Sequence, residues 1–447
     1  MRRSEMALVA LAVCVHAATS QQPSFIDLGN NYADHEILQE EDLMVFQTGS
    51  TAWIGRIDPA TGAFVAGDGR EWLVDSDISS LQTSRNGPEF GIDSGGWTVW
   101  YNTNSGPRVR ITRATPTGGF GSPFLRETLT GVQFDRVNQL PSQNANDGTT
   151  YVLYGRGAIS GFDRDIAYLS EADPANDIEV TPLTPGAAGF RWIDNSSELL
   201  STIGDLASAD YGQIVLIDAS TGEREVITDD PGIKFDPFGW LAPEFGGARL
   251  AIAALDESDI AVYREAEPFW ERIAVLSPPV ESGLSFVQSP EPFVAGGRSY
   301  VVTTLKNAEG PVIGGNVTES QVWLYGIDDR PDRRFAMRVD DPSGAFPVRH
   351  EGEAYLGADE LFIYYNDVRP TGIGMVLTRT GIRLDLPGNC FPADRAPPYG
   401  ILSGDDALRL FDEIEDGDAA ADLDDDGDID IFDAIEFFRI SDACGGV

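Results

Sequence analysis

The sequence contains very little of three residue types that carry much of protein chemistry. Among 447 residues there are three histidines, three cysteines and only two lysines, Lys234 and Lys306. Basic residues number 31 against 72 acidic ones, so the net charge is −41 at pH 7. Binding to a phosphate backbone needs a basic surface that releases counterions. This composition therefore argues against a nucleic-acid partner and against an anionic membrane surface.

The shortage of histidine and cysteine narrows the chemistry further. Only His35 and His350 lie beyond the first 20 residues, which excludes a metal centre built from several histidines. A cysteine nucleophile is excluded if Cys390 and Cys444 are bridged. The sequence has neither a phosphate-binding P-loop nor the glycine fingerprint of a dinucleotide site. Carboxylate chemistry is what remains for an enzyme of this composition.

No apolar run reaches the length of about 20 residues that a membrane-spanning helix needs. Residues 7–18 (ALVALAVCVHAA) follow a positively charged start and lead into small residues before Gln21. This is the pattern of a secretory signal, so we expect residues 1–20 to be removed and the protein to be secreted, without insertion in a membrane. Cys14 then leaves with the signal. An even number of cysteines in an exported chain predicts a disulfide between Cys390 and Cys444, and two unpaired thiols are the alternative.

Short strand-like runs fill the chain from about residue 25 to residue 385. Typical runs are residues 97–101 (WTVWY), 300–303 (YVVT) and 361–365 (LFIYY), and turn residues separate them, in a sequence with 48 glycines and 27 prolines. Many short strands at regular spacing indicate a sandwich, a barrel or a propeller. We therefore expect a mainly β domain over residues 21–385.

Internal echoes help to choose among these folds. Asp58-Pro-Ala-Thr-Gly62 is repeated as Asp218-Ala-Ser-Thr-Gly222, and both segments suit tight hairpin turns. A second echo runs through residues 87–91 (GPEFG), 242–246 (APEFG) and 289–293 (SPEPF), each followed by a turn and a strand. Repeats of roughly 40–50 residues with four strands each predict a β-propeller. The pattern resembles extracellular propellers of five to seven blades; a pair of two-sheet sandwiches is the alternative.

Three glutamates of the second echo, Glu89, Glu244 and Glu291, are candidate catalytic acids. Glycosidases use two carboxyl groups that flank the scissile bond, and a propeller can gather acids from inner strands around its axis. The arrangement resembles the five-bladed arabinanase and xylosidase class, although Asp34 is followed by His35 where that class has proline. The alternative is that each glutamate closes a blade turn. The sequence thus favours a propeller that binds a glycan or a protein, with a glycoside hydrolase as the second hypothesis.

The C-terminal segment, residues 390–447, holds 17 acidic residues and three arginines. Counted from Asp422 as position 1, acidic side chains fall at positions 3, 5, 9 and 12, with Gly427 at position 6. Calcium loops of the EF-hand type need oxygen ligands at such positions around a sharp turn. A solvated acidic tail is the alternative. The spacing predicts a calcium site whose ligand positions are Asp422, Asp424, Asp426, Asp428 (through its carbonyl), Asp430 and Asp433.

These residues resemble a dockerin, a small α-helical module of paired calcium loops. The first half, which starts at Asp394, has Ala396, Pro398 and Leu402 in place of three ligands, so we expect it to bind calcium poorly. With Cys390 and Cys444 as brackets, residues 386–447 resemble the GC-type dockerins of exported planctomycete-like bacterial proteins. The resemblance implies a cohesin-like protein partner and an association with extracellular polysaccharide degradation.

Overall fold

A computed structural model gives the arrangement of the strands. It describes residues 24–382, except for residues 31–32, 77, 79–87, 94–95, 103–108, 114–123, 126–131, 138–149, 157–163, 170–177, 183–187, 194–195, 219–220, 222, 313–314, 329–330, 332–333, 343–345, 359 and 369–374, and it also describes Leu410. The predictions on residues 1–20 and on residues 386–447, the calcium ligands and the disulfide among them, lie outside the described residues, Leu410 apart.

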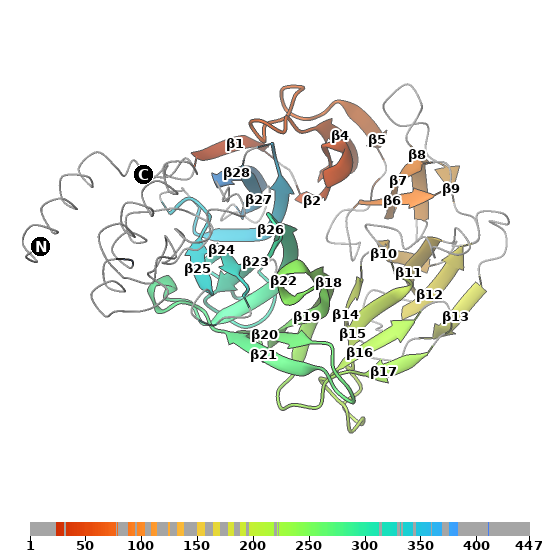
Figure 1. Ribbon diagram of the computed structural model, residues 1–447. Helices are drawn as coiled ribbons and strands as arrows, with labels where there is room; N and C mark the ends of the chain where they lie inside the picture. Colours follow the sequence, from red (N-terminus) through yellow and green to blue (C-terminus); the bar gives the residue numbers. More distant parts are fainter. Residues whose placement is uncertain are drawn as a thin grey trace, which may run out of the picture.

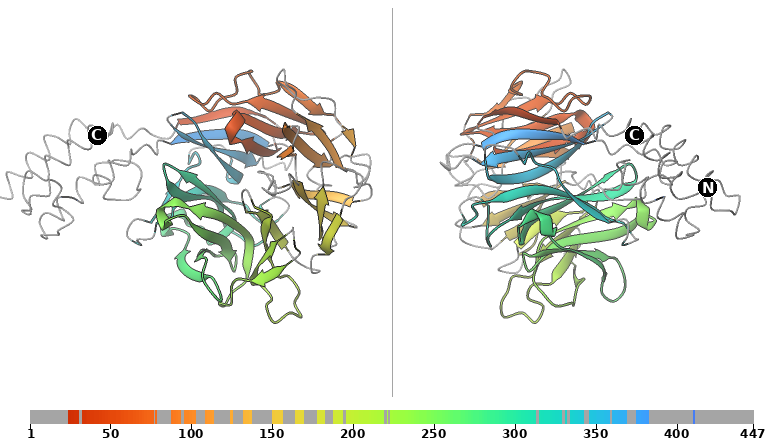
Figure 2. Two further views of the ribbon diagram at one scale, coloured as in Figure 1. Left: turned by 45° about the vertical axis from the view of Figure 1, so that its right-hand side comes forward. Right: turned by 90° about the vertical axis from the view of Figure 1, so that its left-hand side faces the viewer.

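The described strands form seven antiparallel sheets of four strands each. The sheets are arranged in a ring (Figures 1 and 2). The predicted β-propeller is therefore confirmed, with seven blades, the upper end of the expected range. We number the blades in chain order from the first complete hairpin.

Each of the first three blades consists of four consecutive strands. Blade 1 contains β2 (Ala33–Leu38), β3 (Leu43–Thr48), β4 (Thr51–Arg56) and β5 (Trp72–Asp75). Blade 2 contains β6 (Glu89–Asp93), β7 (Gly96–Asn102), β8 (Val109–Arg113) and β9 (Phe124–Leu125). Blade 3 contains β10 (Val132–Val137), β11 (Thr150–Arg156), β12 (Arg164–Leu169) and β13 (Ile178–Pro182).

The next three blades repeat this order. Blade 4 contains β14 (Ala188–Trp192), β15 (Glu198–Thr202), β16 (Ile214–Asp218) and β17 (Arg224–Val226). Blade 5 contains β18 (Lys234–Ala242), β19 (Ala248–Leu255), β20 (Asp259–Arg264) and β21 (Glu271–Leu276). Blade 6 contains β22 (Phe286–Ala295), β23 (Arg298–Lys306), β24 (Ser320–Gly326) and β25 (Phe335–Arg338). Short 3₁₀ helices lie at η1 (Gln39–Glu41), η3 (Pro243–Phe245) and η4 (Val280–Ser282).

Blade 7 closes the ring with strands from both ends of the propeller. It contains β26 (Val348–Leu356), β27 (Leu361–Val368) and β28 (Met375–Ile382), and its fourth strand is β1 (Ser24–Asn30). Ser24 pairs with Gly381 and Asn30 with Val376. Opening the ring therefore requires breaking a β ladder, which ties the first and last strands together.

The first strand of each blade lies nearest the axis of the ring (Figure 1). Innermost strands of neighbouring blades contact one another, as β14 and β18, β18 and β22, β22 and β26, and β26 and β2 do. Side chains on innermost strands are therefore the ones that can meet around a common centre.

The cores lie between blades, where the sheet of one blade packs face to face on the next. One cluster joins Ile252 and Val262 of blade 5 to Val301 and Trp323 of blade 6. Because both faces of a blade are covered, every residue of β23 and β24 is buried. This explains why the middle strands read as continuous apolar runs in the sequence instead of alternating ones.

The first Asp-x-x-Thr-Gly segment, residues 58–62, forms the predicted turn. The Asp58 carbonyl accepts hydrogen bonds from the amides of Thr61 and Gly62, and Gly62 has a φ of +62°. In the second copy Thr221 Oγ1 donates to Asp218 Oδ2 at 3.1 Å. The first turn also docks on blade 7, because the Tyr364 hydroxyl donates to the Gly62 carbonyl at 2.6 Å.

Candidate functional site

A β-bulge recurs at the same place in the innermost strands. In β2, β14, β18, β22 and β26, two residues of the innermost strand lie opposite one residue of the second strand. The first extra residue has a positive φ in three of them, at Asp236, Ser289 and Glu351. In blade 7 the second extra residue is Gly352, where a Cβ would fall 2.7 Å from a methyl carbon of Val302. The bulge turns the following side chain in the same direction in each blade.

The residue that follows the bulge is a glutamate in three consecutive blades. Glu291 of blade 6, Glu353 of blade 7 and Glu36 of blade 1 lie opposite Val302, Tyr364 and Val45. No bulge precedes Glu89 of blade 2, but Glu89 lies on the innermost strand opposite Trp100, whose neighbours Val99 and Tyr101 pack toward blade 1, so it is on the same face of its blade as the other glutamates. The same position is occupied by Phe238 in blade 5 and Arg191 in blade 4. We call these six positions the axial ring: Glu36, Glu89, Arg191, Phe238, Glu291 and Glu353.

The residues of the second strands that pair with the ring positions show that the ring side chains have equivalent orientations. Val302 packs toward blade 7, and Tyr364 packs toward blade 1. Val45 packs toward blade 2, and Ile252 packs toward blade 6. Paired residues on adjacent antiparallel strands point to the same face of a sheet. Each ring side chain therefore leaves its strand on the face toward the next blade.

The acidic side of the ring is a coupled group of carboxyls. The Glu353 side chain is hydrogen-bonded to Glu291. Burial and the like charges of Glu291, Glu36 and Glu351 raise the pKa of Glu353 well above its ordinary value. A hydrogen bond between two carboxyl groups requires a proton on one of them. The two carboxyls therefore share one proton.

Two histidines flank these acids. His350 Nε2 lies 3.2 Å from Glu351 Oε1. Burial lowers the pKa of His350, but Glu351 and Glu291 outweigh burial and leave that pKa above its ordinary value. His35 is 2 % exposed, and burial lowers its pKa to about 4. One histidine is therefore paired with an acid, and the other is neutral near pH 7.

Asn366 connects the neutral histidine to the acidic group. Its Nδ2 donates to Glu351 Oε2 at 3.0 Å and lies 3.4 Å from His35 Nδ1. His35 is also hydrogen-bonded to the backbone of Tyr364. His35 Nε2 and Asn366 Oδ1 are buried and have no hydrogen-bonding partner among the residues that the structure describes.

The opposite side of the axial ring has different chemistry. The Arg191 guanidinium carbon lies 4.4 Å from the centroid of the Phe238 ring, in cation–π geometry. Both side chains are partly exposed. The ring thus presents acids on blades 6, 7, 1 and 2, and a stacked arginine and phenylalanine on blades 4 and 5.

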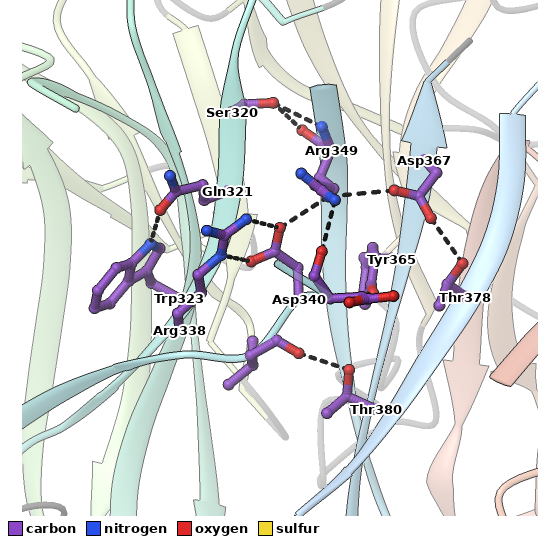
Figure 3. A network of polar contacts seen from close by, with 12 residues as sticks. Ser320, Gln321, Trp323, Arg338, Asp340, Arg349, Tyr365, Asp367, Thr378 and Thr380 are labelled. Carbon is purple, nitrogen blue, oxygen red and sulfur yellow. Dashed lines mark hydrogen bonds and ion pairs between the residues drawn. The ribbon is translucent and has the colours of Figure 1, made fainter. Parts of the chain in front are cut away.

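Buried charges hold β26 in place next to the ring (Figure 3). Arg349, which precedes His350, lies 2.8 Å from Asp340 and 3.3 Å from Asp367 through Nε. Arg338 donates to both carboxylate oxygens of Asp340, at 2.5 and 3.1 Å. The Ser320 hydroxyl donates to the Arg349 carbonyl at 2.6 Å. This network ties β26 to blade 6 and so fixes where Glu351 and Glu353 emerge.

The three glutamates predicted from the sequence echo are not all equivalent. Glu89 and Glu291 occupy the axial ring. Glu244 instead lies in η3, beyond the end of β18, where its Oε1 accepts a hydrogen bond from the Ser299 amide at 2.9 Å. The equivalent of Pro290-Glu291 in blade 5 is Pro237-Phe238. Glu244 links blades 5 and 6, which is the structural role weighed for all three.

The site residues predicted from the sequence did not include Glu353, His350 or Glu36. Glu36, Glu291 and Glu353 each follow a bulge, and a proline precedes the ring glutamate only in blades 2 and 6. Four tryptophans, Trp100, Trp240, Trp270 and Trp323, are buried, with exposed fractions of 3–6 %.

Within the described ranges no three His, Cys, Asp or Glu side chains are placed to hold a metal ion together. In that same part of the chain, no helix has the length and apolar character needed to cross a bilayer.

Comparison with known proteins identifies no relative by sequence. No protein-family model matches the chain, and no curated protein matches it. Among solved structures, the chain is similar to oligogalacturonate lyase from Vibrio parahaemolyticus, with a TM-score of 0.48, 10% identity, and coverage of 82% of this chain and 95% of that one. It is also similar to the Cps50 (Swd1) β-propeller domain from Myceliophteria thermophila, with a TM-score of 0.45, 12% identity, and coverage of 79% and 98%. The Dos1 propeller gives a TM-score of 0.43 at 9% identity, with 78% of each chain covered. At these values no function is transferred, and the chain is a seven-bladed β-propeller protein by its own sheet topology.

Proposed function

We propose that this is a secreted, calcium-binding protein whose propeller binds a glycan at the acidic side of the axial ring. One observation carries the proposal for the propeller: register-equivalent glutamates from adjacent blades converge, with Glu353 hydrogen-bonded to Glu291. Carboxyl groups offer several hydrogen-bond acceptors and, when protonated, a donor. A sugar hydroxyl both donates and accepts hydrogen bonds, so it can pair with both kinds of group. Phe238, with Arg191 stacked on it, adds an aromatic face beside the acids.

A binding assay tests this proposal directly. Plant and algal oligosaccharides are screened against the full-length protein and against a Glu291→Ala, Glu353→Ala double variant. We expect saturable binding of at least one oligosaccharide by the wild type and loss of that binding in the double variant. Binding that survives in the double variant would place the glycan site elsewhere, and the absence of any binding would refute a glycan function.

Hydrolysis of a glycosidic bond is a second candidate, favoured by one specific observation. A general acid needs a raised pKa, as Glu353 has. However, the catalytic carboxyls of glycosidases lie about 5–5.5 Å apart in retaining enzymes and further apart in inverting ones. Glu291 and Glu353 are in direct hydrogen-bond contact, which is closer than either. Release of reducing sugar by the wild type, abolished in Glu353→Gln, would establish hydrolysis.

The C-terminal module is proposed to bind calcium and a cohesin-like protein. The acidic positions of residues 422–433 match an EF-hand-type loop, whereas the first half lacks three ligands. We expect calorimetric titration to show one strong calcium site per chain, which Asp426→Ala eliminates. Two equal sites would contradict the degenerate first half.

A further inference from the structure

One buried arginine of blade 7 has no carboxylate partner among the residues that the structure describes. Arg379 lies on β28 and is 4% exposed, and its Nε and Nη1 atoms are fully buried without a hydrogen-bonding partner in the described part of the chain. Buried polar groups are nearly always paired with protein or with ordered water, and a buried charge without a partner is strongly unfavourable. The guanidinium therefore requires an acceptor that the described residues do not supply.

The other buried cations show what the fold provides for such charges. Four lysine and arginine side chains, with exposed fractions of 0–8%, each lie within 3.2 Å of a carboxylate oxygen: Lys234 with Asp230, Arg298 with Asp328, Lys306 with Glu257, and Arg349 with Asp340. The chain has 72 acidic residues, so acids are not scarce. Arg379 is as buried as these four side chains and differs from them in lacking a carboxylate from the described residues.

The strand register places Arg379 at the seam between blades 7 and 1. Arg379 lies opposite Tyr364 of β27, and paired residues of adjacent antiparallel strands point to the same face of a sheet. Tyr364 packs with Met44 and Phe46 of blade 1, so Arg379 also faces blade 1. The turn over residues 58–62 borders the same seam, because its last carbonyl accepts a hydrogen bond from the Tyr364 hydroxyl.

An aromatic ring holds the guanidinium in position. Its central carbon lies 4.8 Å from the centroid of the Phe362 ring, in cation–π geometry. Such a contact is made through the face of the ring and leaves the N–H donors for other acceptors. A carboxylate can bridge Nη2 and either of the other two nitrogens, which is the bidentate geometry that an arginine favours.

Glu360 is the described acid whose charge acts on Arg379, but it does not take the place of a partner. It lies in the connection between β26 and β27 and is partly exposed, and it makes no hydrogen bond to Nε or Nη1. Burial lowers the pKa of Arg379, and the charges of Tyr364 and Glu360 offset part of this effect. The guanidinium thus remains short of negative charge within the described residues.

We propose that Arg379 anchors a carboxylate-binding site at the seam between blades 7 and 1. β28 is separated from the innermost strand β26 by β27, so the site is distinct from the axial ring and does not depend on the proposed glycan function. The carboxylate accepts hydrogen bonds from the guanidinium and neutralises its charge. Two sources have this chemistry: a carboxylate ligand from solution, and an acidic side chain of residues 383–447, which follow β28 directly and are rich in acids.

Thermal unfolding of the full-length protein tests the site with acetate as the probe. Sodium acetate is compared with sodium chloride at equal ionic strength and pH 7. For a ligand from solution we expect acetate to raise the wild-type midpoint saturably, by about 2 °C at ten times its dissociation constant, and not to raise that of Arg379→Gln. Arg379→Lys keeps the charge without the fork, so its midpoint should rise by less than half as much; it serves the comparison if Arg379→Gln does not fold.

Arg56→Gln is the matched control, because Arg56 also lies over an aromatic ring but is exposed and paired with Glu71. It should respond to acetate as the wild type does. Hydrogen exchange read by mass spectrometry identifies the internal source. If an acid of residues 383–447 occupies the site, acetate has no effect on the wild type, and Arg379→Gln increases exchange in that segment whereas Arg56→Gln does not.

Three results would overturn the proposal. The first is a wild type that does not respond to acetate, together with unchanged exchange of residues 383–447 in Arg379→Gln. The second is an acetate response that persists in full in Arg379→Gln, which would place the anion elsewhere. The third is a midpoint for Glu360→Gln that falls as far as that of Arg379→Gln, which would identify Glu360 as the partner of the guanidinium.

Discussion

The buried network around Asp340 should be a main determinant of stability at the junction of blades 6 and 7. The Asp340 side chain is fully buried and contacts Arg338 and Arg349, and Arg349 is itself 5% exposed. Removing one partner of a buried ion pair costs about 3–5 kcal/mol, because the other charge remains without compensation. Arg349 keeps contacts with Asp367 and the Asp341 carbonyl. We therefore expect Asp340→Asn to cost about 3 kcal/mol, at the lower end of that range.

Urea unfolding followed by circular dichroism measures this cost, as a lower midpoint at an unchanged slope. Asp68→Asn is the control, because Asp68 lies 3.6 Å from Arg70 and both side chains are exposed. Exposed pairs contribute about 0–1 kcal/mol. A double-mutant cycle with Arg349→Met should give a coupling of at least about 1 kcal/mol with Asp340→Asn. Equal destabilisation by the Asp340 and Asp68 substitutions would refute the reasoning.

Two further predictions concern the lysines and the turn that docks on blade 7. Lys234 and Lys306 are 0% and 2% exposed, and their amines are hydrogen-bonded within the protein. Acylation of amines, followed by mass spectrometry, should therefore leave both lysines unmodified in the native protein and modify both after denaturation. Rapid labelling of the native protein would contradict their burial. Gly62→Ala should destabilise by about 1–3 kcal/mol more than Gly49→Ala in urea unfolding: both glycines have a φ of +62°, but only at Gly62 would the new Cβ meet a side chain, Phe362, at 2.6 Å. Equal costs at the two glycines would show that this contact relaxes freely.

Local patterns in the sequence predict the strands and the turns, because those features depend on neighbouring residues. The runs at residues 97–101, 300–303 and 361–365 all lie in second strands of blades. The Asp58 turn likewise forms as its glycine implies. The exact number of blades and the closure of the ring depend on a different kind of information. The pairing of Ser24 with Gly381 joins distant parts of the chain, and nothing in either segment alone specifies it.

Only part of the axial ring could be predicted from the sequence, for a physical reason. Proline precedes Glu89 and Glu291, which makes both positions recognisable in the sequence. The same proline-glutamate pattern at Glu244 occurs in a turn outside the ring. The bulge before Glu353 is made by Glu351 and Gly352 instead. Because a bulge needs a backbone conformation and not one particular residue, its position appears only when the strand register is known.

The central claim is that a glycan binds to the glutamates of the axial ring. The most direct test is a crystal structure of the full-length protein with the tightest-binding oligosaccharide. The account predicts sugar hydroxyls within hydrogen-bond distance of Glu291 and Glu353, with Glu36 alongside. A sugar bound on the outermost strands, with the Glu291 and Glu353 carboxyls uncontacted, would contradict it.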